Sequence, residues 1–356
     1  MSLQHCEEGR FVRLKPSSSH KLMITLLLLF MMTLLCIIFL AQQTQAVKIA
    51  SFNIQVFGQT KLSKPDVVQT LLKITAMYDL IFIMEVRDSS NTTIPEFTRQ
   101  LNNFIPSNSV KYQFQVSDPL GRTTSKEQYA FLYKPDVIKF VKTIQYTDVN
   151  NWFERPPFIF TFELVALPGQ TFAMLGCHIK PTDAVAEMSH LVDVFNYYQN
   201  EAFASNTIIC GDFNAGCSYV STSDWSNITL RTDTRFKWLI NDTMDTTVAS
   251  SVCPYDRFVV PQSMADKSIL KSGSKYEISQ VAIFRFDEQF GLNSTFAPTV
   301  SDHYPIEMTI RVVNTSSGIS PKVSQSTRVS AATHSTFSRI LFAILVLILG
   351  CLGWPT

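Results

Sequence analysis

The stretch SDHYP at residues 301–305 places an Asp and a His directly before the apolar run 306–313, which is a predicted strand. A second stretch, GDFNAGC at residues 211–217, follows the apolar residues 208–210 and places Asp212 at the end of another predicted strand. Strand ends are where α/β proteins gather polar catalytic groups. An Asp beside a His combines a carboxylate that binds metal with a base that titrates near neutral pH.

Short apolar runs alternate with amphipathic segments along the chain, which predicts an α/β fold. The amphipathic segments carry apolar residues at helical spacing, and several of the runs end on a carboxylate or a His or follow a carboxylate. We expect strands at residues 47–55, 80–85, 128–133, 172–177, 208–210, 258–260 and 306–313, and helices at residues 64–78 and 188–201.

Further short motifs occupy these strand ends, and their order along the chain resembles the deoxyribonuclease I family. Each motif is weak alone, but the ordered set is specific, and it covers roughly residues 47–313. The resemblance implies a four-layer α/β sandwich, in which two mixed β-sheets pack face to face and helices flank them. The motifs are KIASFNIQ at 48–55, MEVRD at 84–88, PLGR at 119–122, KEQY at 126–129, CH at 177–178, GDFNAGCSY at 211–219, YDR at 255–257 and SDHYP at 301–305.

The resemblance implies how two His residues divide the acid–base work of phosphodiester hydrolysis. Water must lose a proton and the leaving oxygen must gain one, and a His oriented by its own carboxylate can do either. By the resemblance, His303 paired with Asp256 is the base, and His178 paired with Glu127 is the acid. A lone His is more often structural, but the neighbours of these two match the family motifs.

A hard cation held by carboxylate and amide oxygens would neutralise the charge on the phosphoryl oxygens. The resemblance implies that Glu85 and Asp302, with Asp212 and Asn214, hold Mg²⁺ or Mn²⁺. The alternative for Glu85 is a solvated carboxylate at a strand end, and for Asn214 a simple turn residue.

The resemblance also implies the contacts to DNA. Asn53 and Arg155 would contact the scissile phosphate, and Arg87 would enter the narrow minor groove, which attracts arginine. Ser125 stands where the family carries an aromatic side chain that packs into that groove. The chemistry does not depend on that side chain, but the cutting preference does and stays open.

The family bridges a pair of cysteines that corresponds to Cys217 and Cys253. A bridge of that span contributes roughly 3–4 kcal/mol in the chain-entropy model. A second, smaller disulfide of the family has no counterpart, since residues 148–155 contain no Cys.

A structural calcium loop of the family is matched only in part. Asp245, Thr247 and Ser251 correspond to its ligands, but Ala249 replaces an oxygen ligand. We expect Ca²⁺ at Asp245 and Thr247, with an ordinary polar turn as the alternative.

Residues 1–46 have the features of a secretory signal with an N-terminal extension. Basic residues precede the apolar run 23–40, and Thr44 and Ala46 are the small residues that a signal peptidase recognises. We expect cleavage after Ala46, with Met1 or Met23 as the working start. The alternative is an uncleaved signal anchor, because the run is long enough to span a bilayer.

The C-terminal region has a different organisation. Residues 314–338 are rich in Ser and Thr and are predicted to form a stalk, followed by an apolar tail at 339–356. Small residues at 330–332, a polar spacer and an apolar tail are the layout of a glycosylphosphatidylinositol signal, with attachment near Ser330. The alternative is a short transmembrane anchor.

The chain has 30 basic and 29 acidic side chains, which excludes the strongly basic character of a tight DNA-binding protein. A near-neutral chain suits brief contact with a polyanion. Its N-glycosylation sequons suit a secreted glycoprotein, and they lie at Asn91, Asn227, Asn241, Asn293 and Asn314.

These observations predict a secreted or cell-surface, metal-dependent endonuclease that hydrolyses DNA to 5′-phosphate ends and acts as a monomer. The resemblance leaves actin binding undetermined. The alternatives are a lipid or phosphoinositide phosphoesterase of the same fold, or a catalytically silent binding module on the cell surface.

Overall fold

The computed structural model describes residues 44–124, 126–266 and 274–314, together with Met23, residues 26–27 and residues 29–34. The chain divides into two units, Met1–Ser316 and Ser317–Thr356, and both sheets and the candidate site belong to the first unit. Most of the expected stalk, the apolar tail, Ser330 and Ser125 lie outside the described residues. Among the described residues, no helix combines the length and the apolar character needed to cross a bilayer.

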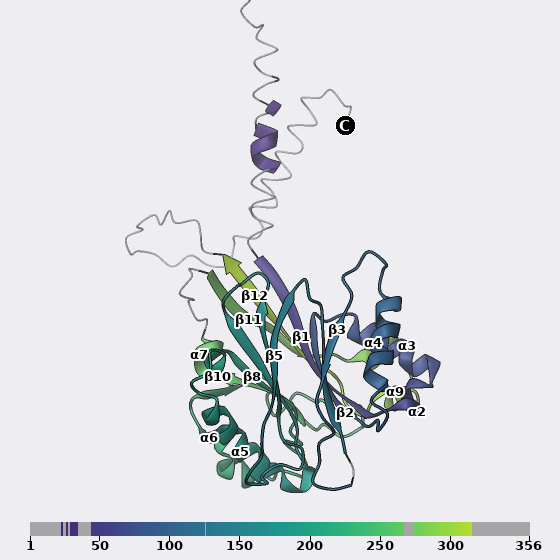
Figure 1. The fold of residues 1–356 in the computed structure, drawn as a ribbon, viewed down its shortest axis with the longest axis vertical. Coiled ribbons are helices and arrows are strands. Elements are labelled where there is room, and N and C mark those ends of the chain that lie inside the picture. The colour runs from purple at the N-terminus through teal and green to yellow at the C-terminus, as the bar shows by residue number, and fades with distance from the viewer. Residues whose placement is uncertain are drawn as a thin grey trace, which may run out of the picture. The chain divides into compact units, whose positions relative to one another are not determined.

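Two mixed β-sheets, each of six strands in the described part of the chain, form the centre of the fold (Figure 1). The first has the order β11 (Ser274–Ile283), β12 (Ile306–Asn314), β1 (Thr44–Phe57), β2 (Leu80–Val86), β4 (Gln128–Tyr133) and β3 (Gln113–Val116). The second has the order β5 (Ile138–Gln145), β6 (Phe158–Leu164), β7 (Thr171–His178), β8 (Thr207–Asp212), β10 (Asp256–Pro261) and β9 (Phe236–Trp238).

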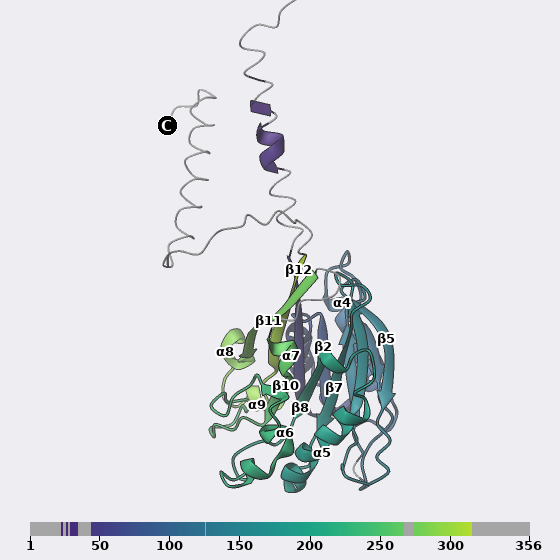
Figure 2. The same ribbon diagram turned by 90° about the vertical axis from the view of Figure 1, so that its left-hand side faces the viewer.

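Helices cover the outer face of each sheet, which makes four layers (Figures 1 and 2). The first sheet is covered by α2 (Gln59–Leu62), α3 (Pro65–Thr75), α4 (Thr93–Phe104), α8 (Phe286–Phe290) and α9 (Ala297–Val300). The second is covered by α5 (Ala184–Tyr197) and α6 (Thr229–Thr232). The 3-10 turns Pro181–Asp183, Ala204–Asn206 and Asp224–Asn227 lie in its connections, and α7 (Gln262–Ala265) follows β10. This is the four-layer sandwich that the family resemblance implied.

The innermost core lies between the two sheets and is rich in aromatic rings. Phe131 of β4 stacks on Phe82 of β2 at 4.8 Å between ring centroids, and on Phe160 of the opposite sheet at 4.9 Å. Offset aromatic pairs of this kind stabilise beyond the area they bury. The strands at the centre of the sheets, such as β4, β8 and β10, are buried along their whole length. They therefore appear in the sequence as continuous apolar runs instead of alternating patterns.

All seven expected strands and both expected helices are present, and all but the strand at 128–133 have shifted bounds. The helix expected at 188–201 begins at Ala184, directly after a 3-10 turn, and ends at Tyr197. The first strand begins at Thr44, three residues before the expected start, and pairs there with Val313 of β12. Cleavage after Ala46 would therefore remove the first three residues of β1.

Candidate active site

Three of the expected site residues form a row across the second sheet. His178 ends β7 and lies in register with Asp212, which ends β8, and Asp212 lies in register with Asp256, which begins β10. Gly211 makes this row possible: its φ is +137°, and a Cβ on it would lie 1.8 Å from the carbonyl oxygen of Cys177. Only glycine allows the two strands to approach so closely here.

The first sheet contributes Asn53 from β1 and Glu85 from β2, and the backbone there is strained. Glu85 has φ +57° and Val56 has φ +52°, which a β-branched residue rarely adopts. The Val56 N–H donates to Glu85 Oε2 at 2.9 Å, so this unusual turn fixes the carboxylate. Strained residues of this kind cluster at functional sites.

Glu127 and His178 form one of the two expected pairs. His178 Nδ1 lies 2.8 Å from Glu127 Oε2, while Arg87 and Arg155 donate to Glu127 Oε1 at 2.7 and 3.3 Å. Burial alone would raise the pKa of Glu127, but the hydrogen bond from His178 and the charges of His178 and the two arginines lower it to about 2. The Tyr129 hydroxyl also accepts the main-chain N–H of His178 at 2.8 Å, so the backbone of His178 is held as well as its ring.

Asp256 and His303 form the second pair, with Nδ1 and Oδ2 2.7 Å apart. Burial alone would lower the pKa of His303, but Asp256 and Asp212 outweigh it and raise that pKa well above its ordinary value. The His303 N–H donates to Ser301 Oγ at 3.1 Å, and Ser301 Oγ donates to the Asn53 carbonyl at 2.6 Å. These bonds join the loop that carries His303 to the end of β1.

Asp212 lies between the two pairs. Its Oδ2 is 3.5 Å from Nε2 of His178 and 3.5 Å from Nε2 of His303. Asn53 Nδ2 donates to the same oxygen at 3.1 Å and is 3.2 Å from Glu85 Oε1. The side chain of Asn53, expected to contact a phosphate, therefore lies between two carboxylates.

Asp302 and Asn214 complete the expected metal ligands. Gln55 Nε2 donates to Asp302 Oδ2 at 2.9 Å, while Asp302 Oδ1 is buried and has no hydrogen-bond partner. Asn214 uses its backbone N–H to donate to Asp212 Oδ1 at 2.9 Å and its amide to donate to the Ile179 carbonyl at 2.8 Å.

The residues present fit a hard divalent cation. Glu85, Asp212 and Asp302 supply carboxylate oxygens at neighbouring strand ends, and one buried oxygen of Asp302 lacks a donor. Among the described residues, one group of three candidate ligands, Asp212, Asp256 and His303, has its ligand atoms within 4.8 Å of one another. That closeness reflects the Asp256–His303 hydrogen bond, which a metal ion would break, so we favour the oxygen ligands.

Three residues that hold the site were not among the expected site residues. Gln55 orients Asp302, Tyr129 supports His178, and Ser301 connects His303 to β1. Gln55, Tyr129 and Ser301 lie inside the quoted motifs, but their roles depend on partners far away in the sequence. In the sequence, only their positions inside these motifs could have identified them.

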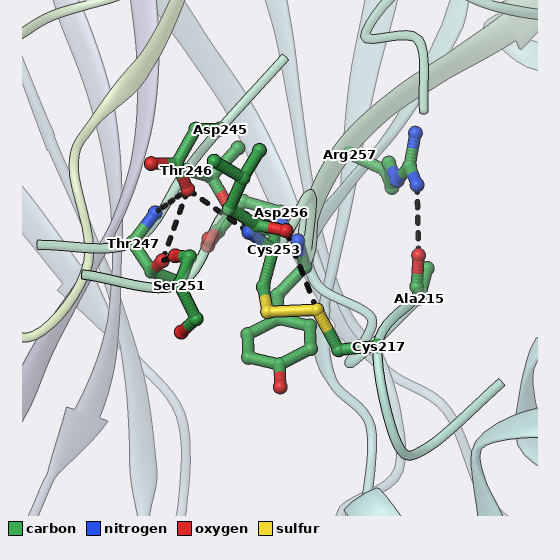
Figure 3. Close-up of a disulfide and its surroundings, with 11 residues drawn as sticks. Ala215, Cys217, Asp245, Thr246, Thr247, Ser251, Cys253, Asp256 and Arg257 are labelled. Carbon is green, nitrogen blue, oxygen red and sulfur yellow. Dashed lines mark hydrogen bonds between the residues drawn. A yellow bond between two sulfur atoms is a disulfide. The ribbon is translucent and has the colours of Figure 1, made fainter. Parts of the chain in front are cut away.

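A disulfide joins Cys217 to Cys253, as the family resemblance implied (Figure 3). Cys217 follows Asp212 in the sequence, and Cys253 precedes Asp256. Between the bridge and β10, Thr246 Oγ1 accepts the N–H groups of Tyr255 and Asp256 at 3.0 and 3.1 Å. The bridge therefore closes the loop from which Asp256 is positioned.

Removal of this bridge in the double variant Cys217→Ser/Cys253→Ser is expected to lower the free energy of unfolding by about 4 kcal/mol, the chain-entropy value for a 36-residue separation. Urea denaturation of the two proteins measures the difference. A matched control is Cys177→Ser/Cys210→Ser under reducing and oxidising conditions, since both thiols are free and buried. This control keeps the Cys217–Cys253 bridge, so reductant should lower its free energy of unfolding only by the amount that loss of the bridge explains. Mass mapping that finds Cys217 and Cys253 as free thiols in the native protein would contradict the assignment.

The loop expected to bind calcium is closed by its own hydrogen bonds (Figure 3). Asp245 Oδ1 accepts the N–H groups of Thr247 and Cys253, each at 3.0 Å, and Thr247 Oγ1 lies 2.9 Å from the Ser251 carbonyl. Such contacts are those of an ordinary polar turn, which was the alternative to a calcium loop. The assignment of Ca²⁺ to this loop stays a prediction.

Four of the five sequon asparagines have exposed side chains, so oligosaccharides could be attached without disturbing the core. They are Asn91, Asn227, Asn241 and Asn293. The side chain of Asn314 lies outside the described part.

Comparison with known proteins places the chain in a family. Residues 50–303 match the model of the Endonuclease/Exonuclease/phosphatase family. Deoxyribonuclease-1 of Canis lupus familiaris is 39% identical over 283 residues, which are 78% of this chain and 96% of that protein. Deoxyribonuclease-1 of Bos taurus is 38% identical over 282 residues, again 78% of this chain and 96% of that protein.

Solved structures agree on the fold. Humanized D. rerio TDP2 with 14 mutations superimposes with a TM-score of 0.51 at 16% identity, over 74% of this chain and 98% of that one. The human Nocturnin catalytic domain gives 0.50 at 15% identity, over 74% and 94%. At such identities the likeness concerns the fold alone. The alignments over most of the chain show that it belongs to the deoxyribonuclease I family, within the endonuclease/exonuclease/phosphatase family.

Proposed function

We propose that this chain is an endodeoxyribonuclease that hydrolyses DNA phosphodiester bonds with a divalent cation. One observation carries the proposal: the Nε2 atoms of His178 and His303 both lie 3.5 Å from the same oxygen of Asp212. Since each Nδ1 is bonded to a carboxylate, each Nε2 is the nitrogen that can exchange a proton with a substrate between them. Membership of the deoxyribonuclease I family supports DNA as that substrate.

In the proposed reaction, His303 in its neutral form accepts the proton of the attacking water, and His178 donates a proton to the leaving oxygen. A cation held at Asp212 would offset one of the charges that raise the pKa of His303 and so favour that neutral form. Water forms the new bond to phosphorus, the bond to the 3′ oxygen breaks, and the products carry a 3′-hydroxyl and a 5′-phosphate. Asp256 and Glu127 keep each ring in the tautomer and orientation that these transfers need.

Side chains around the site would offset the negative charge of the phosphoryl group. We propose that Arg155 and Asn53 contact the phosphate oxygens, while Arg87 contacts the groove. Arg87 is bonded to Glu127 but keeps 37% of its side chain exposed, which suits a residue at the rim.

Glu85, Asp212, Asn214 and Asp302 would hold Mg²⁺ or Mn²⁺, since their oxygens suit a hard cation. When bound, such an ion supplies positive charge against the phosphoryl oxygens. The second, structural ion that we propose is Ca²⁺ at Asp245 and Thr247. It would stabilise the loop that precedes Asp256.

The same fold also suits a lipid or phosphoinositide phosphoesterase, and a silent binding module would keep the fold without turnover. The test compares hydrolysis of supercoiled plasmid with hydrolysis of phosphoinositide and sphingomyelin by the purified wild-type chain. We expect nicked and linear plasmid and no release of phosphate or phosphocholine from lipid. If only lipid were hydrolysed, the chain would be a lipid or phosphoinositide phosphoesterase instead. If neither substrate were hydrolysed, it would be a silent binding module.

We also propose the location of the protein, from sequence features and family membership. Residues 1–46 would direct it into the secretory pathway, residues 47–313 would form the catalytic domain, and residues 314–338 would hold that domain away from the membrane. The disulfide and the exposed sequons suit the extracellular side.

A glycosylphosphatidylinositol anchor near Ser330 can be tested by enzymatic release of the protein from cells. Treatment of intact expressing cells with phosphatidylinositol-specific phospholipase C should release plasmid-nicking activity into the medium, because the apolar tail would already have been replaced by the anchor. Activity in medium and cell fractions, with mass spectrometry of the C-terminal peptide, measures this. A protein that stays with the cells and retains residues 340–354 is held by a transmembrane segment instead.

A further inference from the structure

Lys61 is a buried lysine close to the candidate active site, on the short helix α2. It is only 8% exposed, whereas lysines are almost never buried unless their ammonium group is bonded. Burial lowers its pKa to about 8, although the nearby carboxylates Asp302 and Glu85 oppose that shift. None of the acid–base and metal-binding roles assigned to the site residues involves Lys61.

The ammonium group of Lys61 binds two main-chain carbonyls from distant parts of the chain. It donates to the Ile54 carbonyl at 3.2 Å and to the Val300 carbonyl at 3.0 Å. Ile54 lies where the register of β1 with β2 shifts, between Asn53 and Phe57, and Val300 ends α9. Carbonyls at such places lie outside the regular ladders and need another donor.

The two carbonyls belong to segments that carry the chemistry. Ile54 directly follows Asn53, whose amide lies between Glu85 and Asp212. Val300 comes two residues before Asp302 and three before His303. Lys61 therefore joins the β1 end to the 300–303 loop, beside the bonds that Ser301 and Gln55 make between the same two segments.

We propose that Lys61 is a positioning residue for DNA hydrolysis: its ammonium group braces the end of β1 against the 300–303 loop and so sets His303 and Asp302 relative to Asn53. This rests on the proposed function, since it assigns Lys61 to the same reaction. A brace of this kind acts on the geometry of the reacting groups and not on the contacts that hold DNA. Misplacement of catalytic groups by about 1 Å can cost on the order of a hundredfold in rate.

The test compares Lys61→Met, which keeps the chain length but has no donor, with Lys61→Arg, which keeps charge and donors. The control is Lys64→Met, three residues along and exposed. For Lys61→Met we expect kcat on plasmid to fall about tenfold to a hundredfold with KM within about twofold, because only the reacting groups move. Lys61→Arg should recover much of the loss, and Lys64→Met should match the wild type.

A second readout does not depend on turnover. Hydrogen exchange of the peptide that covers residues 297–305 should be faster in Lys61→Met, including the Tyr304 N–H, which donates to the Thr246 carbonyl in the wild type. In a double-mutant cycle, Ser301→Ala and Lys61→Met should be non-additive in kcat, because both remove bonds between the same two segments.

An unchanged kcat per folded molecule in Lys61→Met, or equal losses in Lys61→Met and Lys64→Met, would overturn the proposal. If Lys61→Met does not fold, Lys61→Leu, which also lacks a donor, replaces it with the same expectations, and failure of both variants to fold would make Lys61 a folding residue and reject the positioning role. Absence of plasmid cleavage by the wild type would reject the nuclease assignment separately, since the exchange experiment still reports whether Lys61 braces the loop.

Discussion

Substitution of either His303 or His178 by Ala is expected to lower plasmid hydrolysis at least about a hundredfold, the usual scale for the loss of a general base or acid. Each imidazole has its Nδ1 on a buried carboxylate and its Nε2 towards Asp212, so an alanine removes the only group at that position that can carry the proton. Initial rates of supercoil loss, corrected for the folded fraction, measure the effect.

His190 offers a matched control for this experiment. Its Nδ1 is also bonded to a carboxylate, Asp193 at 2.9 Å, but it lies on α5 and stacks on Trp152 away from the row of site residues. His190→Ala should keep nearly full activity. A folded variant at His178 or His303 that nicks plasmid as fast as the wild type would remove that residue from the mechanism.

Glu85→Gln is expected to reduce DNA hydrolysis about a hundredfold or more while leaving the domain folded, a cost typical of losing one electrostatic stabiliser of the transition state. The carboxylate accepts the N–H of Val56 and faces the amide of Asn53, and an amide would offer a divalent cation only a weak neutral oxygen. Excess chelator should abolish wild-type activity, and added Mg²⁺ or Mn²⁺ should restore it.

Substitution of a surface carboxylate is the control that distinguishes the loss of a site ligand from the loss of a negative charge. Glu96 lies on α4 and pairs with Arg99, so Glu96→Gln changes the net charge by the same amount without touching the site. It should keep wild-type activity and metal dependence. Full wild-type turnover in excess chelator would rule out the metal-dependent mechanism.

The sequence predicted most of the central strands and missed the four edge strands of the described sheets, together with the buried inner strand β6. Strands such as β4 and β8 are buried throughout, so they appear as unbroken apolar runs between turns. The edge strand β5 has a mostly part-exposed pattern, and β3 has no buried residue. Such strands are defined by hydrogen bonds to a neighbour, and a neighbour distant in the sequence leaves no periodic signal.

The candidate site divides in a similar way. Residues that carry charge or a titratable ring, such as His178 and Asp212, lie in short motifs whose order along the chain made them recognisable. The residues that hold them in place act through tertiary contacts: Lys61 binds carbonyls at positions 54 and 300, and Thr246 binds the N–H of Asp256. Nothing local in the sequence distinguishes these from ordinary buried polar residues.

The pairing of β1 with β12 has a mechanical consequence. β12 begins three residues after His303 and pairs antiparallel with β1 as far as Val313, with β11 paired on its other side. In a chain held by its C-terminal segment, tension from long DNA engaged at the site would pull along the axis of β12. The inter-strand hydrogen bonds lie across that axis, so they would resist in shear and share the load, instead of opening one after another from an end. The domain is therefore expected to withstand greater pulling force from this direction than from its sheet edges, as single-molecule stretching could measure.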